Sequence, residues 1–199
     1  MRSASHGEAG YEIRKAGDYF TQPWVTEILC QYMKIKGKTI FEPACGDGRM
    51  SDVLSKMGNI VISNDLHNYG YPHQDYQFDF LRDSHPANDY DMIITNPPYD
   101  YITEFIQLAV GLTKRNSGCV MMLARHEFDA THHALFDYPF RSKLVLPRRP
   151  RWIDGEEGKK AAPRFPYAWY CWDWKVDPAE HPTVIWLTDT GKSVHGREL

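Results

Sequence analysis

The sequence has no apolar run of membrane-spanning length, and its N-terminus lacks the apolar core of a signal peptide. These absences predict a cytoplasmic protein without a membrane partner. Only four cysteines occur among 199 residues, and none has the paired spacing of a zinc site. Three of them lie in apolar runs, which predicts buried, reduced thiols. Internal repeats and low-complexity segments are also missing.

A basic excess is missing too, since the formal net charge is −3. A nucleic-acid-binding protein of this charge must carry a local cationic face. Hydrophobic residues make up 42% of the chain, which argues against wholesale disorder. Five tryptophans crowd into the last third, namely Trp152, Trp169, Trp172, Trp174 and Trp186. We expect these rings to fill a core rather than to stack on a planar ligand.

The length fits a single domain, which we place at residues 18–190, between an N-terminal arm (1–17) and a C-terminal tail (191–199). Strand patterns occupy residues 39–45, 59–65, 75–81, 90–95, 119–124, 143–146, 168–174 and 183–187. Helical patterns occupy residues 24–33, 50–57, 101–112 and 131–136. The first helix has Thr21 as its candidate N-cap and Pro23 in its first turn. This alternation predicts an α/β fold, doubly wound around a mostly parallel sheet, with ligands beyond the carboxyl ends of the strands.

Two glycines separated by one residue follow the first predicted strand. Gly46 and Gly48 allow a tight turn and close approach of a ligand to the backbone, although many such turns are purely structural. No third glycine follows at the dinucleotide-binding spacing, so a pyrophosphate is not the expected ligand. Glu42 suits a cationic ligand, such as the amino group of a methionine moiety, and a capping role is equally compatible with its position.

Acidic residues also stand at the ends of the next two predicted strands. Asp65 is placed to accept the hydroxyls of a ribose, and Asp79 could receive an adenine amino group. Phe80 would pack nearby, although its periodicity also fits a core residue. Each residue alone has an ordinary structural explanation. Together they would contact the amino acid, ribose and base of one ligand in chain order.

The fourth predicted strand ends in Asn96-Pro97-Pro98-Tyr99. Two prolines cannot continue a sheet ladder, so the chain leaves the sheet there and the Pro97 carbonyl loses its ladder partner. That carbonyl and the Asn96 carboxamide oxygen could bind the two hydrogens of one planar amino group. The nitrogen lone pair is then drawn out of conjugation and can attack a methyl sulfonium. Tyr99 offers a flat face for the ring that bears the amino group, and a Pro-Pro turn capped by Asn96 is the structural alternative.

These motifs resemble those of class I S-adenosylmethionine-dependent methyltransferases, specifically the amino-methylating branch that includes DNA N6-adenine methyltransferases. The matching segments, in the family's order, are 19–23, 42–48, 65, 79–81 and 96–99. Gln22 is an apparent insertion in the first of them. The resemblance covers about residues 18–124, and the last third is reminiscent of short phage and prophage methylases. A bacterial or phage-infected host cytoplasm is the location that this likeness implies.

The resemblance implies a seven-stranded Rossmann-like sheet, S-adenosylmethionine as cofactor, and direct methyl transfer to an exocyclic nitrogen without metal or covalent intermediate. The catalytic residues it implies are Asn96, Pro97 and Tyr99. The cofactor-binding residues it implies are Tyr19, Thr21, Glu42, Pro43, Ala44, Cys45, Gly46, Gly48, Asp65, Leu66, Asp79, Phe80 and Asn96. Independently, no cysteine lies where it could attack a base near Tyr99, which disfavours C5-cytosine chemistry. Adjacent His132 and His133 point in different directions on a helix, so we expect a solvated surface there and no metal.

A basic segment over residues 141–166 is the candidate cationic face. Eight basic residues and three acidic ones fall between positions 141 and 164, among glycines and prolines that predict an exposed loop. The residues that we expect to anchor nucleic-acid phosphates are Arg148, Arg149, Arg151, Lys159 and Lys160. A solvated loop without function is the alternative.

DNA adenine is the acceptor that the combined motifs favour, since a base extruded from a duplex could stack on Tyr99. RNA amino-methylation with the same tetrapeptide stays open. Protein glutamine methylation also stays open, although that class usually carries a helical substrate domain before the glycine turn. A non-enzymatic S-adenosylmethionine-binding regulator is the fourth alternative, and the intact tetrapeptide speaks against it.

Overall fold

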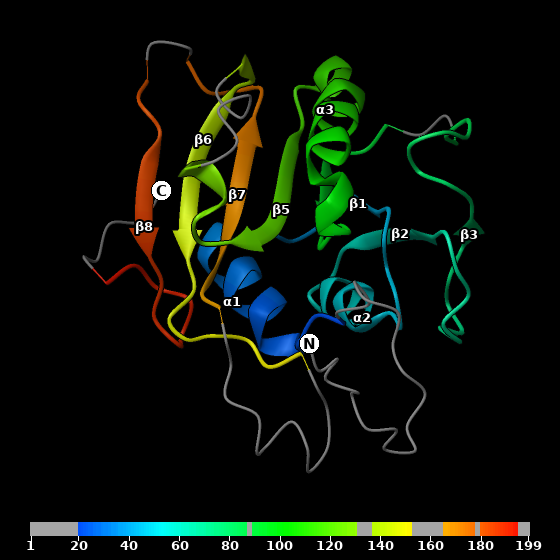
Figure 1. Cartoon of the computed structure of the whole chain (residues 1–199), viewed down its shortest axis with the longest axis horizontal. Coiled ribbons are helices and arrows are strands. Elements are labelled where there is room, and N and C mark those ends of the chain that lie inside the picture. The colour runs from blue at the N-terminus through cyan, green and yellow to red at the C-terminus, as the bar shows by residue number, and fades with distance from the viewer. Residues whose placement is uncertain (1–19, 87–88, 131–136, 153–164, 178–179, 195–199) are drawn as a thin grey trace, which may run out of the picture.

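An eight-stranded sheet organises the chain in the computed structural model, which describes residues 20–86, 89–130, 137–152, 165–177 and 180–194. Its strands are β1 (Thr39–Glu42), β2 (Ile60–Asp65), β3 (Tyr76–Gln77), β4 (Met92–Thr95), β5 (Cys119–Arg125), β6 (Phe140–Val145), β7 (Tyr167–Asp173) and β8 (Thr183–Trp186). The order across the sheet is β3-β2-β1-β4-β5-β7-β6-β8, with β3 at one edge and β8 at the other (Figure 1). Only β7 runs antiparallel to its neighbours.

The predicted mostly parallel α/β fold is therefore confirmed. The sheet has the eight strands that the sequence patterns suggest, and not the seven that the resemblance implies. The strand predicted over 183–187 is β8, which pairs in parallel with β6. The predicted helix over 131–136, His132 and His133 within it, the N-terminal arm and Tyr19 lie outside the described residues. Within the described part of the chain, no helix is long and apolar enough to span a membrane.

Helices cover both faces of the sheet. They are α1 (Pro23–Met33), α2 (Arg49–Lys56) and α3 (Ile102–Thr113), with short 3-10 turns at Tyr99–Tyr101, Lys114–Asn116 and Phe128–Ala130. Alternation along β1 sends Ile40 into the core that contains α1 and α2, and Phe41 into the core that contains α3. The apolar positions of α3 recur at helical spacing, which buries one side of that helix against the sheet.

Tryptophan mainly fills the core, as predicted. Trp169 and Trp172 are at most 1% exposed on the central strand β7, and they pack on opposite faces of the sheet. Trp186 differs, since it lies on the edge strand β8 and is 48% exposed. An edge strand has a neighbour on one side only, so its side chains are less covered.

The third strand is shorter than predicted, because a side chain replaces its backbone ladder. Residues 75–81 were expected to be extended, but only Tyr76 and Gln77 pair with β2. Beyond them, the buried Asn64 side chain accepts a hydrogen bond from the Phe78 amide (3.0 Å) and donates one to the Phe78 carbonyl (3.0 Å). The strand therefore ends where Asn64 satisfies both backbone groups of Phe78.

The predicted N-cap of α1 is wrong. Thr21 is buried, and the residue at the cap position is Gln22, which has an extended backbone and makes no capping bond with its side chain. The Gln22 carboxamide oxygen instead accepts hydrogen bonds from Trp24 Nε1 and from the Arg151 amide, each 3.0 Å long. Pro23 occupies the first turn as predicted, where its missing N–H costs nothing.

The cysteines should react slowly in the folded protein. All four are free thiols, and burial raises the pKa of Cys30, Cys119 and Cys171 to about 12. Burial also raises the pKa of Cys45. At pH 8 a thiol with such a pKa is roughly 10⁻⁴ ionised, and the thiolate is the reactive form. We expect labelling with Ellman's reagent to be at least about a hundredfold slower than in urea, where all four thiols should react. Rapid labelling of the folded chain would contradict this prediction.

Candidate active site

The glycine turn after β1 lies at the carboxyl ends of the parallel strands. Gly46 and Gly48 both have positive φ angles, 57° and 84°, which L side chains rarely adopt. The carboxylate of Asp65, at the end of β2, accepts a hydrogen bond from the Gly46 amide (2.8 Å) and another from the His67 amide (2.9 Å). Asp65 therefore fixes the turn to the neighbouring strand.

Two aromatic rings cover this turn. A β-carbon at Gly46 would lie 2.8 Å from the ring of Phe20, and one at Gly48 would lie 2.1 Å from the ring of Tyr71. The Tyr71 hydroxyl donates a hydrogen bond to Asp52 in α2 (3.0 Å), which holds the ring in place. The backbone conformation thus favours glycine at both positions, and with the rings placed as they are a larger side chain would also collide with them.

A small pocket joins the glycine turn to the Asn-Pro-Pro-Tyr segment. It is lined by Phe20, Thr21, Glu42, Ala44, Cys45, Gly46, Asp47, Arg49, Met50 and Asn96. Six of these residues were predicted from the sequence, namely Thr21, Glu42, Ala44, Cys45, Gly46 and Asn96. The structure therefore brings together residues from the chain before α1 and from the ends of β1 and β4. Its volume is only about 20 Å³, because the side chain of Phe20 closes over it.

Among the predicted cofactor-binding residues that do not line this pocket are Pro43, Leu66, Asp79 and Phe80. The Pro43 carbonyl accepts a hydrogen bond from Asn64 (3.2 Å), and Leu66 is 52% exposed just after Asp65. The Asp79 carboxylate accepts a hydrogen bond from the Leu81 amide (2.9 Å) and thereby shapes the turn after β3. Phe80 is buried against Phe41 and Phe105 of the core.

Glu42 is buried, and its carboxyl group accepts a hydrogen bond from the Ser51 hydroxyl. Burial raises the pKa of Glu42 well above its usual range, since the charged form is desolvated there. The hydrogen bond from Ser51 opposes this shift without cancelling it. Burial thus favours the protonated form of Glu42, and a cation bound in the pocket would favour its ionised form.

The Asn-Pro-Pro-Tyr segment leaves the sheet directly after β4, as its prolines predict. The Tyr99 hydroxyl donates a hydrogen bond to the Asn96 carboxamide oxygen (3.1 Å). Within the described residues, nothing donates to the Pro97 carbonyl, whereas the Pro98 carbonyl accepts from the Tyr101 amide (3.1 Å). The Tyr99 ring packs 6.1 Å from the ring of Tyr167 in β7.

The predicted phosphate anchors divide into different environments. Arg148 lies 4.3 Å over the Trp24 ring and pairs with Asp189 (3.2 Å), so its charge is partly compensated. Arg149 and Arg151 are exposed. Lys159 and Lys160 lie outside the described residues.

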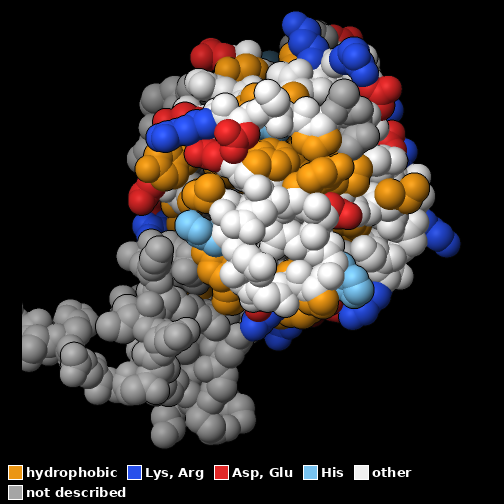
Figure 2. Space-filling view, turned by 90° about the vertical axis from the view of Figure 1, so that its right-hand side faces the viewer, with side chains coloured by type: hydrophobic (Ala, Val, Ile, Leu, Met, Phe, Trp, Pro, Cys, Tyr) orange, Lys and Arg blue, Asp and Glu red, His pale blue; other side chains and the backbone are white. Residues whose placement is uncertain are grey.

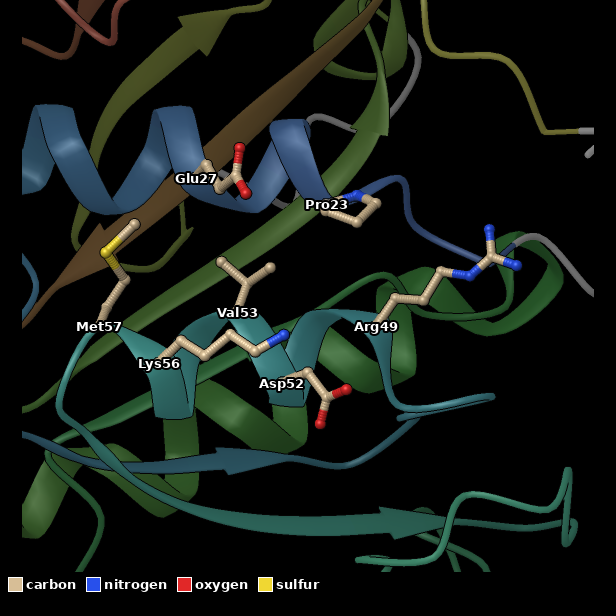
Figure 3. A pocket seen from close by; sticks show the side chains of 7 residues that line it. All are labelled: Pro23, Glu27, Arg49, Asp52, Val53, Lys56 and Met57. Atoms are coloured by element: carbon tan, nitrogen blue, oxygen red, sulfur yellow. The ribbon is translucent and has the colours of Figure 1, made fainter.

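A larger cleft, of about 180 Å³, lies between α1 and α2 (Figure 3). Glu27 and Pro23 line it from α1, and Arg49, Asp52 and Lys56 line it from α2. Charges of both signs mix along this seam between two helices, and Asn96 is not part of its lining. We therefore place the candidate active site in the smaller pocket, which contains the convergent polar groups.

Solved structures share this fold. A type I restriction-modification methyltransferase subunit from Streptococcus thermophilus is 13% identical, with a TM-score of 0.64 over 87% of this chain and 48% of its own. A class I S-adenosylmethionine-dependent methyltransferase of putative assignment from Listeria monocytogenes is 14% identical, with a TM-score of 0.57 over 89% and 68% of the two chains. An RNA methyltransferase, also of putative assignment, from Pyrococcus horikoshii is 16% identical, with a TM-score of 0.58 over 83% and 92%.

The chain therefore has the class I methyltransferase fold, and it spans about half the length of the Streptococcus subunit. No protein-family profile matches the sequence, and no curated protein is significantly similar to it in sequence.

Several site residues were not singled out from the sequence. Phe20 lies within residues 19–23, the first segment that resembles the family, so its neighbours in the sequence could have pointed to it. No sequence pattern pointed to Arg49 or Tyr71, because their positions depend on how α2 and the loop after β2 fold over the glycine turn.

Glu42→Gln should change how stability depends on pH. Between the usual carboxyl pKa and the raised pKa of the folded state, folded Glu42 keeps a proton that the unfolded chain releases. Wild-type stability should therefore fall as pH rises through this window, by up to about 1.4 kcal/mol per pH unit, whereas the Gln variant lacks this loss. Urea unfolding from about pH 5 to pH 8 measures the difference. Glu180→Gln, at an exposed position, is the control, and parallel curves for Glu42→Gln and wild type would contradict the prediction.

Proposed function

We propose that this chain transfers a methyl group from S-adenosylmethionine to an exocyclic amino nitrogen, namely N6 of adenine in DNA. The observation that carries the proposal is the position of Asn96 in one pocket with the glycine turn, Thr21 and Glu42. Cofactor-binding and acceptor-binding groups would then meet at one point. The fold of the Streptococcus type I modification subunit supports the same class of reaction.

The residues around the glycine turn fit the proposed cofactor. Gly46 and Gly48 have no side chain between their backbone and a ligand, and the carboxylate of Asp65 is of the type that accepts ribose hydroxyls. Glu42 would face the cationic amino group of the methionine moiety. Ligand sites of this kind have volumes of roughly 300–1,000 Å³, so the side chains of Phe20 and Tyr71 must turn away from the glycines. When bound, the cofactor supplies an electrophilic methyl group.

The Asn96 oxygen and the Pro97 carbonyl would then bind the acceptor nitrogen. Each would accept one hydrogen of the planar amino group. As that nitrogen attacked a methyl carbon, the methyl–sulfur bond would break and its electron pair would stay on sulfur, which leaves as a neutral thioether. The nitrogen would gain positive charge until it released a proton to solvent, and the two carbonyl dipoles would stabilise this charge. Binding of the amino group competes with the hydrogen bond from the Tyr99 hydroxyl to Asn96, so Tyr99 is free to stack on the acceptor ring.

Labelled S-adenosylmethionine should therefore place its methyl group on DNA adenine. We expect label in unmethylated DNA when DNA, RNA and protein lysate are offered in parallel, with N6-methyladenine as the product in a mass-spectrometric digest. Asn96→Ala should still bind the cofactor but transfer at least about a hundredfold more slowly. Label on RNA would move the acceptor to that nucleic acid, and label on glutamine alone would end the nucleic-acid assignment. Cofactor binding without any transfer would favour a regulatory role.

Tyr99 should act through its ring and not through its hydroxyl. Tyr99→Phe keeps the ring and removes the group that occupies Asn96, so we expect kcat within about threefold of wild type. Tyr99→Leu loses the stacking face, and kcat/KM should fall by about ten- to a hundredfold. Steady-state methylation of one oligonucleotide compares the three proteins. Equal losses in the Phe and Leu variants would show that the hydroxyl itself is needed.

A further inference from the structure

Arg125 ends β5 next to the point where the Asn-Pro-Pro-Tyr segment leaves the sheet. The register between β4 and β5 pairs Thr95 with Met122, so the segment leaves the sheet beside a β5 residue that lies three positions before Arg125. On the other side, Arg125 pairs with Tyr167 of the antiparallel β7. Side chains directly opposite in an antiparallel pair share one face of the sheet. Arg125 and Tyr167 therefore project to the same side.

A series of aromatic rings occupies this side. The ring of Tyr167 lies 6.1 Å from that of Tyr99 and 4.9 Å from that of Trp152. Phe165, two residues before Tyr167, is 41% exposed and continues the series toward Arg125. The proposed acceptor face at Tyr99 thus lies on the same side of the sheet as Arg125 and the exposed ring just before β7.

The guanidinium of Arg125 lies 4.3 Å over the centre of the Phe165 ring. The Arg125 side chain is exposed, and within the described part of the chain no carboxylate pairs with it. Other cations near β6 are paired, as in Arg141–Asp173 (2.7 Å), Lys143–Asp129 (2.8 Å) and Arg148–Asp189 (3.2 Å). Arg125 therefore presents a positive charge that a ligand could use.

The backbone at Arg125 is firmly held. The Tyr170 hydroxyl donates hydrogen bonds to the carbonyls of Arg125 (3.1 Å) and His126 (2.9 Å). The His126 carbonyl also accepts from the buried ammonium group of Lys143 (2.5 Å), and the His126 amide donates to the Pro166 carbonyl (3.0 Å). These bonds fix Arg125 relative to β6 and β7, so its guanidinium starts from a preorganised position.

We propose that Arg125 and Phe165 bind the sugar–phosphate backbone beside the target nucleotide, Arg125 through a phosphate and Phe165 by supporting the guanidinium. The inference rests on the proposed function and adds the residues that would hold the DNA backbone beside the target base. Guanidinium groups bind phosphate oxygens through two parallel N–H donors, and alternating cations and aromatic faces are typical of sites for unstacked nucleic-acid strands. The β3 side of the molecule exposes hydrophobic side chains such as Leu66 and Tyr76, and its described basic side chains stand at the margins (Figure 2).

Arg125→Gln tests the inference by the salt dependence of binding to a fluorescent single-stranded deoxyoligonucleotide. Loss of one phosphate contact should weaken binding about tenfold at low salt and reduce the slope of log K against log salt by about 0.7. Phe165→Leu should weaken binding less, because the charge remains. Arg115→Gln is the control, since this exposed arginine lies before the amino-terminal end of β5, whereas Arg125 is at its carboxyl end, and it should leave the slope unchanged.

A second measurement locates the contact. Replacing the phosphate next to the target adenine by a neutral methylphosphonate should weaken binding to the wild type, but cause no further loss in Arg125→Gln. KM for the oligonucleotide should rise in this variant while kcat stays within about threefold. If the wild type methylates DNA and Arg125→Gln keeps the wild-type slope, the inference is wrong and the proposed function stands. If the wild type methylates only protein, both are wrong, and a selective loss toward acidic peptides in Arg125→Gln would assign the residue to a protein substrate.

Discussion

The candidate site depends on how the end of β2 is tied to its two neighbours. Asn64 and Asp65 together bind the turn after β1 and the chain after β3: the Asn64 carbonyl accepts from the Cys45 amide (2.8 Å), and Asp65 accepts from the Gly46 amide (2.8 Å). The Asn64 side chain is completely buried and satisfies both backbone groups of Phe78. Because these polar groups are buried, each would be costly to leave unpaired. Two adjacent residues thereby hold three strand ends in one arrangement.

Much of the fold could be predicted from the sequence because its signals are local. Apolar strands that alternate with amphipathic helices define a covered parallel sheet, and the glycine turn and Asn96 fall at strand ends in the chain itself. The length of β3 could not be predicted, since it is set by the Asn64 side chain, which comes from another strand. The cap of α1 was misjudged for a similar reason: Gln22 is held by Trp24 and by the distant Arg151.

Contacts between residues distant in sequence were also missed at the candidate site. Sequence patterns did predict that Thr21, Glu42 and Asn96 lie in one region, and these three residues line one pocket. These patterns gave no indication of Arg125, which is distinguished only by two neighbours distant in sequence, Tyr167 of β7 and Phe165. They also suggested a free Asn96 oxygen, whereas the Tyr99 hydroxyl occupies it. Such contacts depend on side-chain positions across strands, and a linear pattern does not encode them. The Asn96 oxygen thus already has a partner in the resting site, so an acceptor amino group would have to replace the Tyr99 hydroxyl there.

The antiparallel strand β7 has a consequence for synthesis on the ribosome. It is inserted between β5 and β6, although it follows both in the chain. When β6 emerges, neither of its eventual neighbours, β7 and β8, has yet been made, so it must wait without a hydrogen-bonded partner. The strands from β3 to β5 can pair with one another before β6 is made, and only the outer edge of β5 then waits for β7. The contact of the Tyr99 ring with the Tyr167 ring is thus among the last to form. A nascent chain that ends before residue 173 contains the glycine turn but lacks a complete β7, the strand that carries Tyr167.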